Sequence, residues 1–407
     1  MPETVTAVIL ALMRIVDLQT LRADGGWRPF SFLKVTTDEG LTGWAEFAEG
    51  AWSPALPEVI RELGRQVIGR DPRSFARLSA ELHAITQFTA GGLSHQAIAA
   101  IENACLDIAA KARSMPVYAL FGGPFREAVD VYWSHCGSFR ARHAELFEKV
   151  LGKPRLTRTS DFERLGEEAV ARGFKAVKTN PILFEKDGPV LLNPGFVPQG
   201  LSFGRGLDEQ TLHVIADQCA ALRAALGPDR GLMLDVNFSL RPESLRRLAP
   251  LLEPSRLRWL ETDLHDPAAL GAFRSVCRVP IASLESIYGR RGYKPYFEAQ
   301  AVDTAVVDVL WNGFAESARI ASLAETFEVN VAPHNFYGPL ADLMSAHFCA
   351  VVGNLAIMEI EGDDVPWKSS LLTSAPELRE GQFVIPTGAG WGADVNEDAV
   401  REHPWSR

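Results

Sequence analysis

Three acidic residues stand at a regular spacing in the second half of the 407-residue chain. Asp235, Glu261 and Glu285 each lie at the end of a short apolar run, 26 and 24 residues apart, which is about one strand-helix unit each. If the runs are parallel strands, the carboxylates converge, and they cannot all stay ionised unless a cation neutralises them. Oxygen ligands without Cys or His favour Mg²⁺, one ion per subunit. Any one of the three alone could be a solvated residue at a helix start, but the shared phase predicts a metal site.

The next two runs supply an acid and a histidine. Asp308 lies in the run at 303–309, and His334 follows the run at 329–333, again 26 residues later. A carboxylate beside an imidazole fixes the tautomer and raises the basicity of the ring, which suits a general base that works near neutral pH. A histidine by itself is more often a structural hydrogen-bonding group. The phasing with Asp308 predicts instead that His334 is catalytic.

A lysine and an amide end an earlier run. The segment GFKAVKTNP, residues 173–181, is typical of a buried strand that ends at Thr179-Asn180-Pro181. Side chains two apart in a strand face the same side, so Lys178 and Asn180 are expected to point into the same space.

Eight short apolar runs position these side chains. They cover residues 129–136, 174–178, 231–236, 258–262, 280–285, 303–309, 329–333 and 355–360. Most are followed by a helical stretch, which predicts parallel strands joined by crossover helices. A barrel is favoured over an open sheet because polar residues recur at the C-terminal ends of the runs. The connection at 181–208 is unusually long, and we expect a lid or rim element there.

The residues before the barrel form a different unit. Strands are expected at 4–16, 29–37 and 40–47, and helices at 55–68, 73–87 and 94–113. This mixture predicts an α+β domain of roughly 125 residues, a common domain size.

Composition limits the partners. The chain is 47 % hydrophobic and 23 % charged, as expected for a globular protein, and its net charge of −10 argues against nucleic acid and anionic membranes. No apolar run is long enough to span a membrane. The five cysteines show no Cys-x-x-Cys pair, and the N-terminus has no signal-peptide pattern, so we expect a reducing, cytoplasmic location. A small-molecule ligand is favoured.

Motifs that cover nearly the whole chain point to one family. They are LTGWAEF (41–47), AIAAIENACLDIAAKARSMPVYALFGG (97–123), LMLDVN, WLET, IASLES, VVDVLWNGFAESARIASLAE, APHNFYGPL and PTGAGWGADVNE (386–397). Together they resemble the enolase superfamily, in its mandelate racemase-like branch of acid-sugar dehydratases. The resemblance implies an α/β fold, a modified TIM barrel of (β/α)7β type over 126–374. It also implies an α+β capping domain over 1–125, completed by 375–407, and a homo-oligomer.

The resemblance also implies roles. Asp235, Glu261 and Glu285 would bind Mg²⁺, and His334, paired with Asp308, would remove the proton α to a substrate carboxylate. The Mg²⁺ ion and Lys178 would stabilise the resulting enediolate, chemistry known for this superfamily. Racemases of the branch carry Lys-x-Lys where this chain has Lys178-Thr179-Asn180, and an amide accepts no proton at neutral pH. The sequence therefore favours a one-base elimination of water from a sugar acid to a 2-keto-3-deoxy acid.

The proton donor to the leaving hydroxyl is open at this stage. The Lys-x-Asn motif resembles galactonate dehydratases, but their acid on the third strand is a His where this chain has Asn237. Either His334 returns the proton in a syn elimination, which we favour, or another group supplies it: His135, Tyr337 or Lys178. Further substrate contacts are expected from Asn180, Asn237, Glu359, Arg28 and Trp27.

Two other functions are compatible with the sequence. One is an epimerase, racemase or cycloisomerase that forms the same enediolate, with Lys178 opposite His334. The other is a homologue that keeps the fold and metal as a binding or regulatory protein. The sequence names neither the sugar acid nor the oligomeric state.

Overall fold

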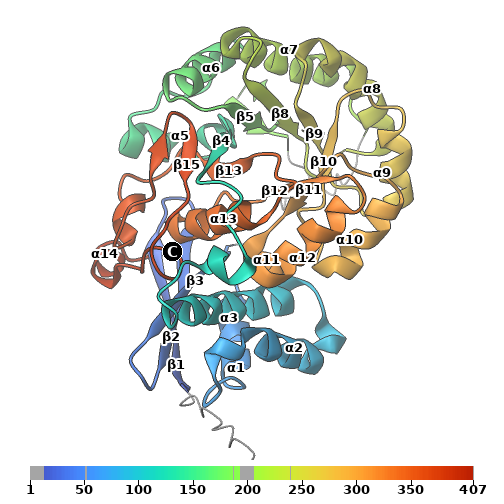
Figure 1. The fold of residues 1–407 in the computed structure, drawn as a ribbon. Helices are drawn as coiled ribbons and strands as arrows, with labels where there is room; N and C mark the ends of the chain where they lie inside the picture. The colour runs from blue at the N-terminus through green and yellow to red at the C-terminus, as the bar shows by residue number, and fades with distance from the viewer. Residues whose placement is uncertain (1–12, 51–52, 187, 193–205, 239, 407) are drawn as a thin grey trace, which may run out of the picture.

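The computed structural model describes residues 13–50, 53–186, 188–192, 206–238 and 240–406. A small α+β unit lies at one end of the molecule and a larger strand-helix unit at the other (Figure 1).

The small unit is a three-stranded antiparallel sheet covered by helices. Its strands are β1 (Ile15–Asp24), β2 (Pro29–Thr37) and β3 (Thr42–Phe47), in the order β1-β2-β3. Its helices are α1 (Leu56–Gly64), α2 (Phe75–Ile85) and α3 (Gly92–Lys111). Helix α3 packs on β3 and is buried almost throughout from Gln96 to Ala110, so it forms the centre of the unit.

One strand differs from its predicted position. The first strand is expected at 4–16, but β1 begins at Ile15 and pairs with β2 as far as Asp24. The reason is that β1 mixes apolar residues with polar and exposed ones, so it lacks the continuous apolar run used to predict it. Residues 4–12 lie outside the described part of the chain.

Within the described residues, eight parallel strands form the predicted barrel, whose place in the molecule is drawn in Figure 1. They are β4 (Ala128–Ser134), β5 (Ala176–Thr179), β8 (Gly231–Asp235), β9 (Trp259–Glu261), β10 (Ile281–Ser283), β11 (Thr304–Val307), β12 (Asn330–Pro333) and β13 (Met358–Glu361). The pairing order is β12-β11-β10-β9-β8-β5-β4-β13. A bridge between Val331 and Leu355 links β12 to the segment before β13 and closes the ring.

Each of the seven connections between consecutive barrel strands contains a helix that packs outside the strands, which gives the (β/α)7β pattern. These helices are α6 (Asp161–Ala171), α7 (Glu209–Leu226), α8 (Pro242–Leu252), α9 (Pro267–Arg274), α10 (Gly289–Glu298), α12 (Phe314–Glu325) and α13 (Pro339–Val351). Short helices α4 (Ser138–Arg142), α5 (Ala144–Leu146) and α11 (Val309–Asn312) lie in the loops after β4 and β11.

The long connection at 181–208 begins with a hairpin. Strands β6 (Ile182–Glu185) and β7 (Gly188–Leu191) pair antiparallel, and Phe184 contacts Phe162 edge to face at 6.4 Å between ring centroids. The expected lid or rim includes residues 193–205, which lie outside the described part of the chain.

The C-terminal segment returns to the small unit. After the hairpin of β14 (Leu378–Arg379) and β15 (Gln382–Val384), Trp391 donates a hydrogen bond from Nε1 to the carbonyl of Trp44 at 2.8 Å. Helix α14 (Glu397–Glu402) packs beside β1, and Pro404 bridges to Ala23. Figure 1 shows this C-terminal segment beside the small unit.

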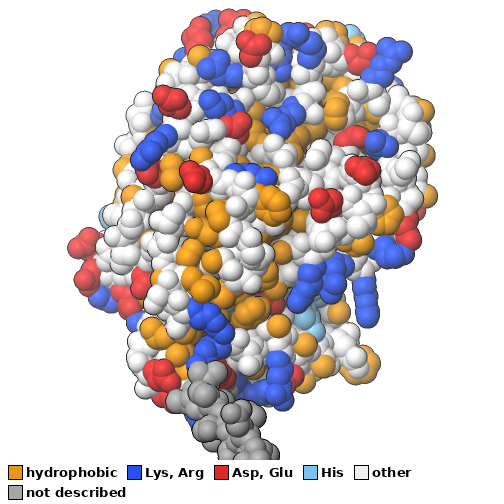
Figure 2. Space-filling model, in the orientation of Figure 1, with side chains coloured by type: hydrophobic (Ala, Val, Ile, Leu, Met, Phe, Trp, Pro, Cys, Tyr) orange, Lys and Arg blue, Asp and Glu red, His pale blue; other side chains and the backbone are white. Residues whose placement is uncertain are grey.

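The surface carries both signs of charge. On the face drawn in Figure 2, acidic and basic side chains are intermixed over the barrel. All five cysteines are free thiols, and four of them are buried. In the described residues, no helix is long and apolar enough to cross a membrane.

Candidate active site

One inward-facing residue from each barrel strand, or from the segment just before β13, forms a closed apolar layer. It contains Tyr132, Ala176, Met233, Trp259, Ala282, Val306, Ala332 and Ile357. Side chains two residues further along a strand face the same way. The next layer is therefore Ser134, Lys178, Asp235, Glu261, Leu284, Asp308, His334 and Glu359, all buried. The period of the strands thus gathers the predicted side chains at the C-terminal end of the barrel, where active sites of this architecture lie.

Strand β10 is an exception, because the residue that it places in this second layer is apolar. Its residue in the second layer is Leu284, whose backbone has φ = 90°, a strained value for a residue with a Cβ atom. The turn is held by Asp263, whose Oδ1 atom accepts hydrogen bonds from the N–H of Leu284 (2.9 Å) and the hydroxyl of Ser283 (2.7 Å). The carboxylate of this strand comes from the following residue, Glu285.

The three predicted ligands form a concentration of buried negative charge. Burial and then the neighbouring Glu261 raise the pKa of Asp235 to about 7. Burial raises the pKa of Glu285 well above its usual value, and the charges of Asp235 and Glu261 add to that rise. The charge of Glu261 thus makes Asp235 harder to ionise, and the charges of both make Glu285 harder to ionise.

The chemistry of this donor set fits a hard divalent cation. Three buried carboxylates from neighbouring strands supply only oxygen donors, and their mutual repulsion is what a cation would relieve. Among the described residues, no three or more His, Cys, Asp or Glu side chains are arranged so that they could bind one metal ion in their present conformations. Both oxygens of Glu261 are instead turned to the Nζ atom of Lys178, and one also accepts from Nε1 of Trp259.

Asp308 and His334 form the predicted pair. The Nδ1 atom of His334 lies 2.7 Å from Oδ2 of Asp308, whose Oδ1 accepts the backbone N–H groups of Leu310 and Trp311 at the start of α11. These bonds fix the carboxylate, so Nδ1 carries the proton and Nε2 is directed elsewhere. Nε2 lies 3.3 Å from Oε2 of Glu285. Although burial opposes it, the charges of Glu285 and Asp308 raise the pKa of His334 to about 10.

Tyr337 supports this pair. Its hydroxyl donates a hydrogen bond to Oδ2 of Asp308 at 2.6 Å, and burial with the charge of Asp308 raises its pKa well above the usual value. The phenol proton is therefore held by the Asp308 carboxylate.

Lys178 lies between two carboxylates. Its Nζ atom is 3.0 Å from Oε1 of Glu261 and 2.9 Å from Oε1 of Glu359. Burial disfavours the ammonium, yet the two acids raise the pKa of Lys178 well above its usual value. Burial likewise opposes ionisation of Glu359, but the charge of Lys178 lowers its pKa to about 2. The lysine is thus a fixed cation at the centre of the barrel mouth.

The two predicted amides bond to the protein. Asn180 accepts a hydrogen bond from the hydroxyl of Ser138 (2.8 Å) and donates one from Nδ2 to the carbonyl of Asp235 (3.0 Å). Asn237, which adopts φ = 47°, donates from its backbone N–H and from Nδ2 to the carboxylate of Asp235, at 2.8 and 3.0 Å. Both amides brace the backbone or side chain of Asp235.

His135 meets a carboxyl group that the sequence predictions do not include. Its Nδ1 atom lies 3.2 Å from Oε2 of Glu361, which is fully buried, and 2.9 Å from the hydroxyl of Ser134. Glu361 follows Glu359 by two residues, so the strand period could have placed it on the same face. Phe336 is a second addition, since its ring contacts both His135 and His334 at 5.0 and 5.1 Å between centroids.

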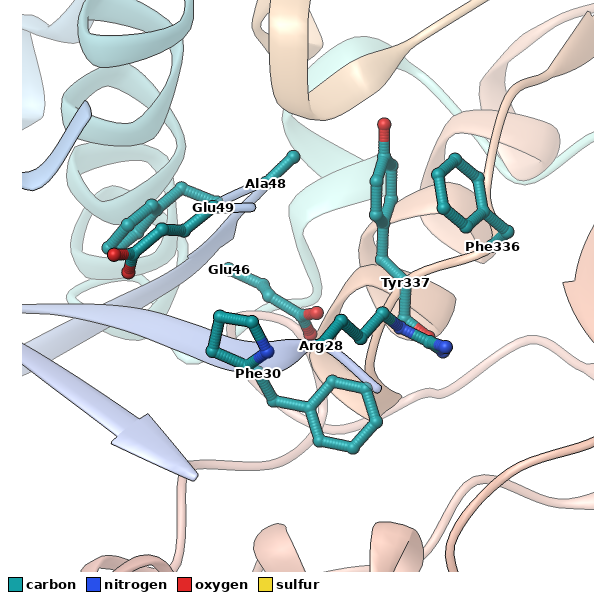
Figure 3. Close-up of a pocket in the computed structure, with 9 residues that line it drawn as sticks. Arg28, Phe30, Glu46, Ala48, Glu49, Phe336 and Tyr337 are labelled. Atoms are coloured by element: carbon teal, nitrogen blue, oxygen red, sulfur yellow. The ribbon is translucent and has the colours of Figure 1, made fainter. Parts of the chain in front are cut away.

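The loop between β1 and β2 covers this end of the barrel. Arg28 is buried, stacks over the ring of Trp27 at 4.5 Å, and donates from Nη2 to Asp364 (3.0 Å) and to the carbonyl of Tyr337 (3.3 Å). Its Nε and Nη1 atoms, and Nε1 of Trp27, are buried and have no hydrogen-bond partner among the described residues. Figure 3 shows Arg28 reaching the Phe336-Tyr337 loop across a small hollow that Glu46 also lines.

A barrel of this type, closed by a small α+β unit and carrying three carboxylates and an Asp-His pair at strand ends, defines a family. Residues 161–399 match the family model described as enolase C-terminal domain-like. Residues 9–122 match the N-terminal domain of the mandelate racemase and muconate lactonizing enzymes. The chain belongs to the enolase superfamily, in this branch.

Individual relatives carry different activities in their names. The D-xylonate dehydratase of Haloferax volcanii is 28 % identical over 96 % of this chain and 88 % of its own length. The D-galactarolactone cycloisomerase of Agrobacterium fabrum is also 28 % identical, over 92 % of this chain and 91 % of its own. A crystal structure from Burkholderia xenovorans, described as a candidate L-alanine-DL-glutamate epimerase bound to magnesium and fumarate, is 40 % identical with a TM-score of 0.91. That match covers 96 % of both chains.

Proposed function

We propose that the protein is a Mg²⁺-dependent acid-sugar dehydratase. It removes the proton α to a carboxylate, eliminates the β-hydroxyl as water, and releases a 2-keto-3-deoxy acid after tautomerisation. The observation that carries the proposal is the buried Asp308-His334 pair, 2.7 Å apart, set beside buried carboxylates whose mutual repulsion a cation would relieve. The dehydratase name of the Haloferax volcanii relative supports the same reaction class.

Each residue has a defined part in this reaction. Asp235, Glu261 and Glu285 would hold the metal ion, which when bound would neutralise them and stabilise negative charge on the substrate carboxylate. Lys178 presents a fixed cation to the same developing charge, which lowers the barrier because the charge grows in the transition state. His334 takes the α-proton at Nε2 in its neutral form, while Asp308 holds the proton on Nδ1. Although burial opposes it, the charge of Glu285 is the largest contribution that raises the pKa of His334 to about 10, and a cation held by Glu285 would bring that pKa back toward neutrality.

The surroundings of Asn180 favour one base over two. A second base opposite His334 would be needed to deliver a proton to the other face of the same carbon. Asn180 stands at the place of the second lysine of racemases, and both ends of its amide are already bonded to Ser138 and to the Asp235 carbonyl. Elimination needs no base at that position.

A screen of sugar acids tests the proposal. The purified protein with Mg²⁺ is incubated with aldonic and aldaric acids, including D-xylonate, and 2-keto acid is detected as its semicarbazone. We expect product from at least one acid, abolished by His334→Asn while the variant still binds Mg²⁺. A panel without product refutes the dehydratase proposal, and an active His334→Asn variant refutes the assignment of the base.

An isomerase is the second candidate. It is favoured by the names of the Agrobacterium fabrum and Burkholderia xenovorans proteins and by the presence of Lys178 across from His334. Solvent exchange separates the two. In D₂O an epimerase places deuterium in recovered substrate, a dehydratase places it in the keto acid, and a binding or regulatory homologue does neither.

A further inference from the structure

His135 and Glu361 lie across the barrel from the proposed metal ligands. They come from the C-terminal ends of β4 and β13, which are paired with each other, whereas the three carboxylates come from β8, β9 and the end of β10. In the closed ring these two groups of strands face each other. A substrate whose carboxylate is held on the β8-β10 side therefore extends its remaining carbons and hydroxyls toward His135.

The contacts of His135 orient its ring. Ser134 donates its hydroxyl proton to Glu359 at 2.6 Å, so it has no proton to offer to Nδ1 of His135, which lies 2.9 Å from the Ser134 oxygen. Oε2 of Glu361 meets the same nitrogen at 3.2 Å. With Nδ1 turned to these two groups, the Nε2 edge points away from them. The imidazoles of His135 and His334 both contact the ring of Phe336, so the two histidines share one pocket wall.

The pair also stores a proton. Burial lowers the pKa of His135 to about 3 and raises that of Glu361 well above its usual value, the nearby charge of Asp363 adding to the latter. Both shifts favour a neutral imidazole beside a protonated carboxyl group, and in that form the pair holds two protons. One of these lies between Glu361 and Nδ1, and the other is the N–H of Nε2.

The other candidate donors are engaged elsewhere. The hydroxyl of Tyr337 is bonded to Asp308. Lys178 is held by two carboxylates. His334, the donor that the sequence favours, could return its proton only in a syn elimination, whereas a separate acid leaves His334 to act as the base alone.

We propose that His135 is the general acid of the reaction, with Glu361 as its positioning residue and proton reserve; this inference rests on the proposed dehydratase function. The Nε2–H bond of His135 breaks as the proton moves to the β-hydroxyl oxygen. The C–O bond breaks at the same time, and its electron pair leaves with the new water molecule. The enediolate electrons form the C=C bond of the enol product. The shared proton moves from Glu361 onto Nδ1, which leaves a neutral imidazole beside a carboxylate.

The backbone at His135 guides the choice of variant. Its φ of 51° lies in the left-handed region, held by hydrogen bonds from Cys136 to the Lys178 carbonyl and from Ser138 to the His135 carbonyl, both 2.8 Å. Asn adopts this conformation more readily than most residues, so His135→Asn removes the acid with little strain. In the wild-type protein, Oε1 of Glu361 accepts a hydrogen bond from the N–H of Asp363 at 2.9 Å. Glu361→Gln keeps an oxygen that can accept this bond but removes the carboxyl proton. His213→Asn, on the exposed face of α7, is the matched control.

A leaving group that needs no acid separates catalysis from structure. The probes are an aldonate that the wild-type protein dehydrates, such as D-gluconate, and its 3-deoxy-3-fluoro analogue, because fluoride leaves without protonation. We expect His135→Asn to lose about 10²-fold or more in keto-acid formation from the aldonate, the usual contribution of a general acid, and to retain release of fluoride from the analogue. In D₂O the variant should also place deuterium at C2 of recovered aldonate, because the enediolate then returns to substrate. Glu361→Gln should show the same pattern more weakly.

Two results overturn the inference. One is keto-acid formation by His135→Asn within threefold of the wild-type and His213→Asn rates. The other is equal loss on both probes, which indicates a structural role. If the wild-type protein dehydrates no sugar acid, the proposed dehydratase function itself is wrong. This outcome is distinguished from failure of the His135 inference because no variant and no wild-type sample then forms keto acid.

Discussion

The Nδ1 atom of His334 lies 2.7 Å from Oδ2 of Asp308, and this bond sets which nitrogen of the imidazole can act as a base. An Asp308→Asn variant offers Nδ1 an amide, which can hold the ring in the other tautomer, with Nε2 protonated and unable to accept. We expect kcat to fall by roughly 10² to 10⁴-fold, the range for loss of general base function. The measurement is the initial rate of keto-acid formation from a sugar acid that the wild-type protein dehydrates.

Tyr337→Phe serves as the matched variant for that test. It removes a hydrogen bond to the same oxygen of Asp308 but leaves the carboxylate in place, so the expected loss is near tenfold. Equal rates for Asp308→Asn and the wild-type protein would show that the pair does not control the base.

Lys178 is predicted to matter for both stability and turnover. Lys178→Met leaves Glu261 and Glu359 facing each other in a buried site without their cation. Breaking a buried pair in this way costs roughly 3 to 5 kcal/mol, to be measured as the free energy of unfolding in urea. The double variant Lys178→Met, Glu359→Gln should recover part of that stability but no keto-acid formation. Recovery of turnover in the double variant would remove Lys178 from the mechanism.

Much of the site follows from strand period, and the exceptions have local causes. Asp235, Glu261, Asp308 and His334 are predictable because each lies two residues beyond an apolar residue of the barrel layer. Glu285 is predictable from its spacing although the left-handed backbone at Leu284 shifts it by one residue. The sequence spacing was therefore enough to predict that these side chains meet at one end of the barrel.

Contacts between segments that are distant in the sequence cannot be predicted from the period of single strands. The sequence places Asn180 beside Lys178, but the bonds of its amide to Ser138 and Asp235 depend on how three strands meet. The partnership of His135 with Glu361 joins residues 226 apart. The strand predicted at 4–16 overlaps β1 only at its end, and β1 continues to Asp24 because pairing with β2 does not need a continuous apolar run.

Removal of one proposed ligand is expected to abolish divalent-ion binding. Asp235→Asn reduces the charge of the donor set, and calorimetry with Mn²⁺ or Mg²⁺ should then show no specific binding. The wild-type protein should gain about 2.7 kcal/mol of unfolding free energy at a metal concentration 100 times Kd. Glu377→Gln, at an exposed acidic residue near β14, is the control. Unchanged metal stabilisation in Asp235→Asn would contradict the assignment.

Glu46 gives a prediction about pH. Its carboxylate accepts the N–H groups of Gly338 and Ala341, which ties β3 to the start of α13, and burial raises its pKa to about 7 from 4.5. The folded protein therefore holds this proton more tightly than the unfolded chain between pH 4.5 and 7, so stability falls as pH rises through that window. The full effect is about 3 kcal/mol.

The measurement is urea unfolding of the wild-type protein and Glu46→Gln at pH 5, 6, 7 and 8. Glu46→Gln cannot ionise, so the wild-type curve should decline more steeply with pH while all other groups contribute equally to both. Parallel curves would show that Glu46 is ionised at no cost in the folded protein.

The central claim is that this site eliminates water from a sugar acid with a single base. The most direct measurement is NMR of the wild-type protein with Mg²⁺ and a panel of aldonic and aldaric acids in D₂O. The account predicts a 2-keto-3-deoxy acid that carries deuterium at C3, with no deuterium at C2 of the remaining substrate. Deuterium at C2 of recovered substrate without keto acid would contradict it and identify an isomerase.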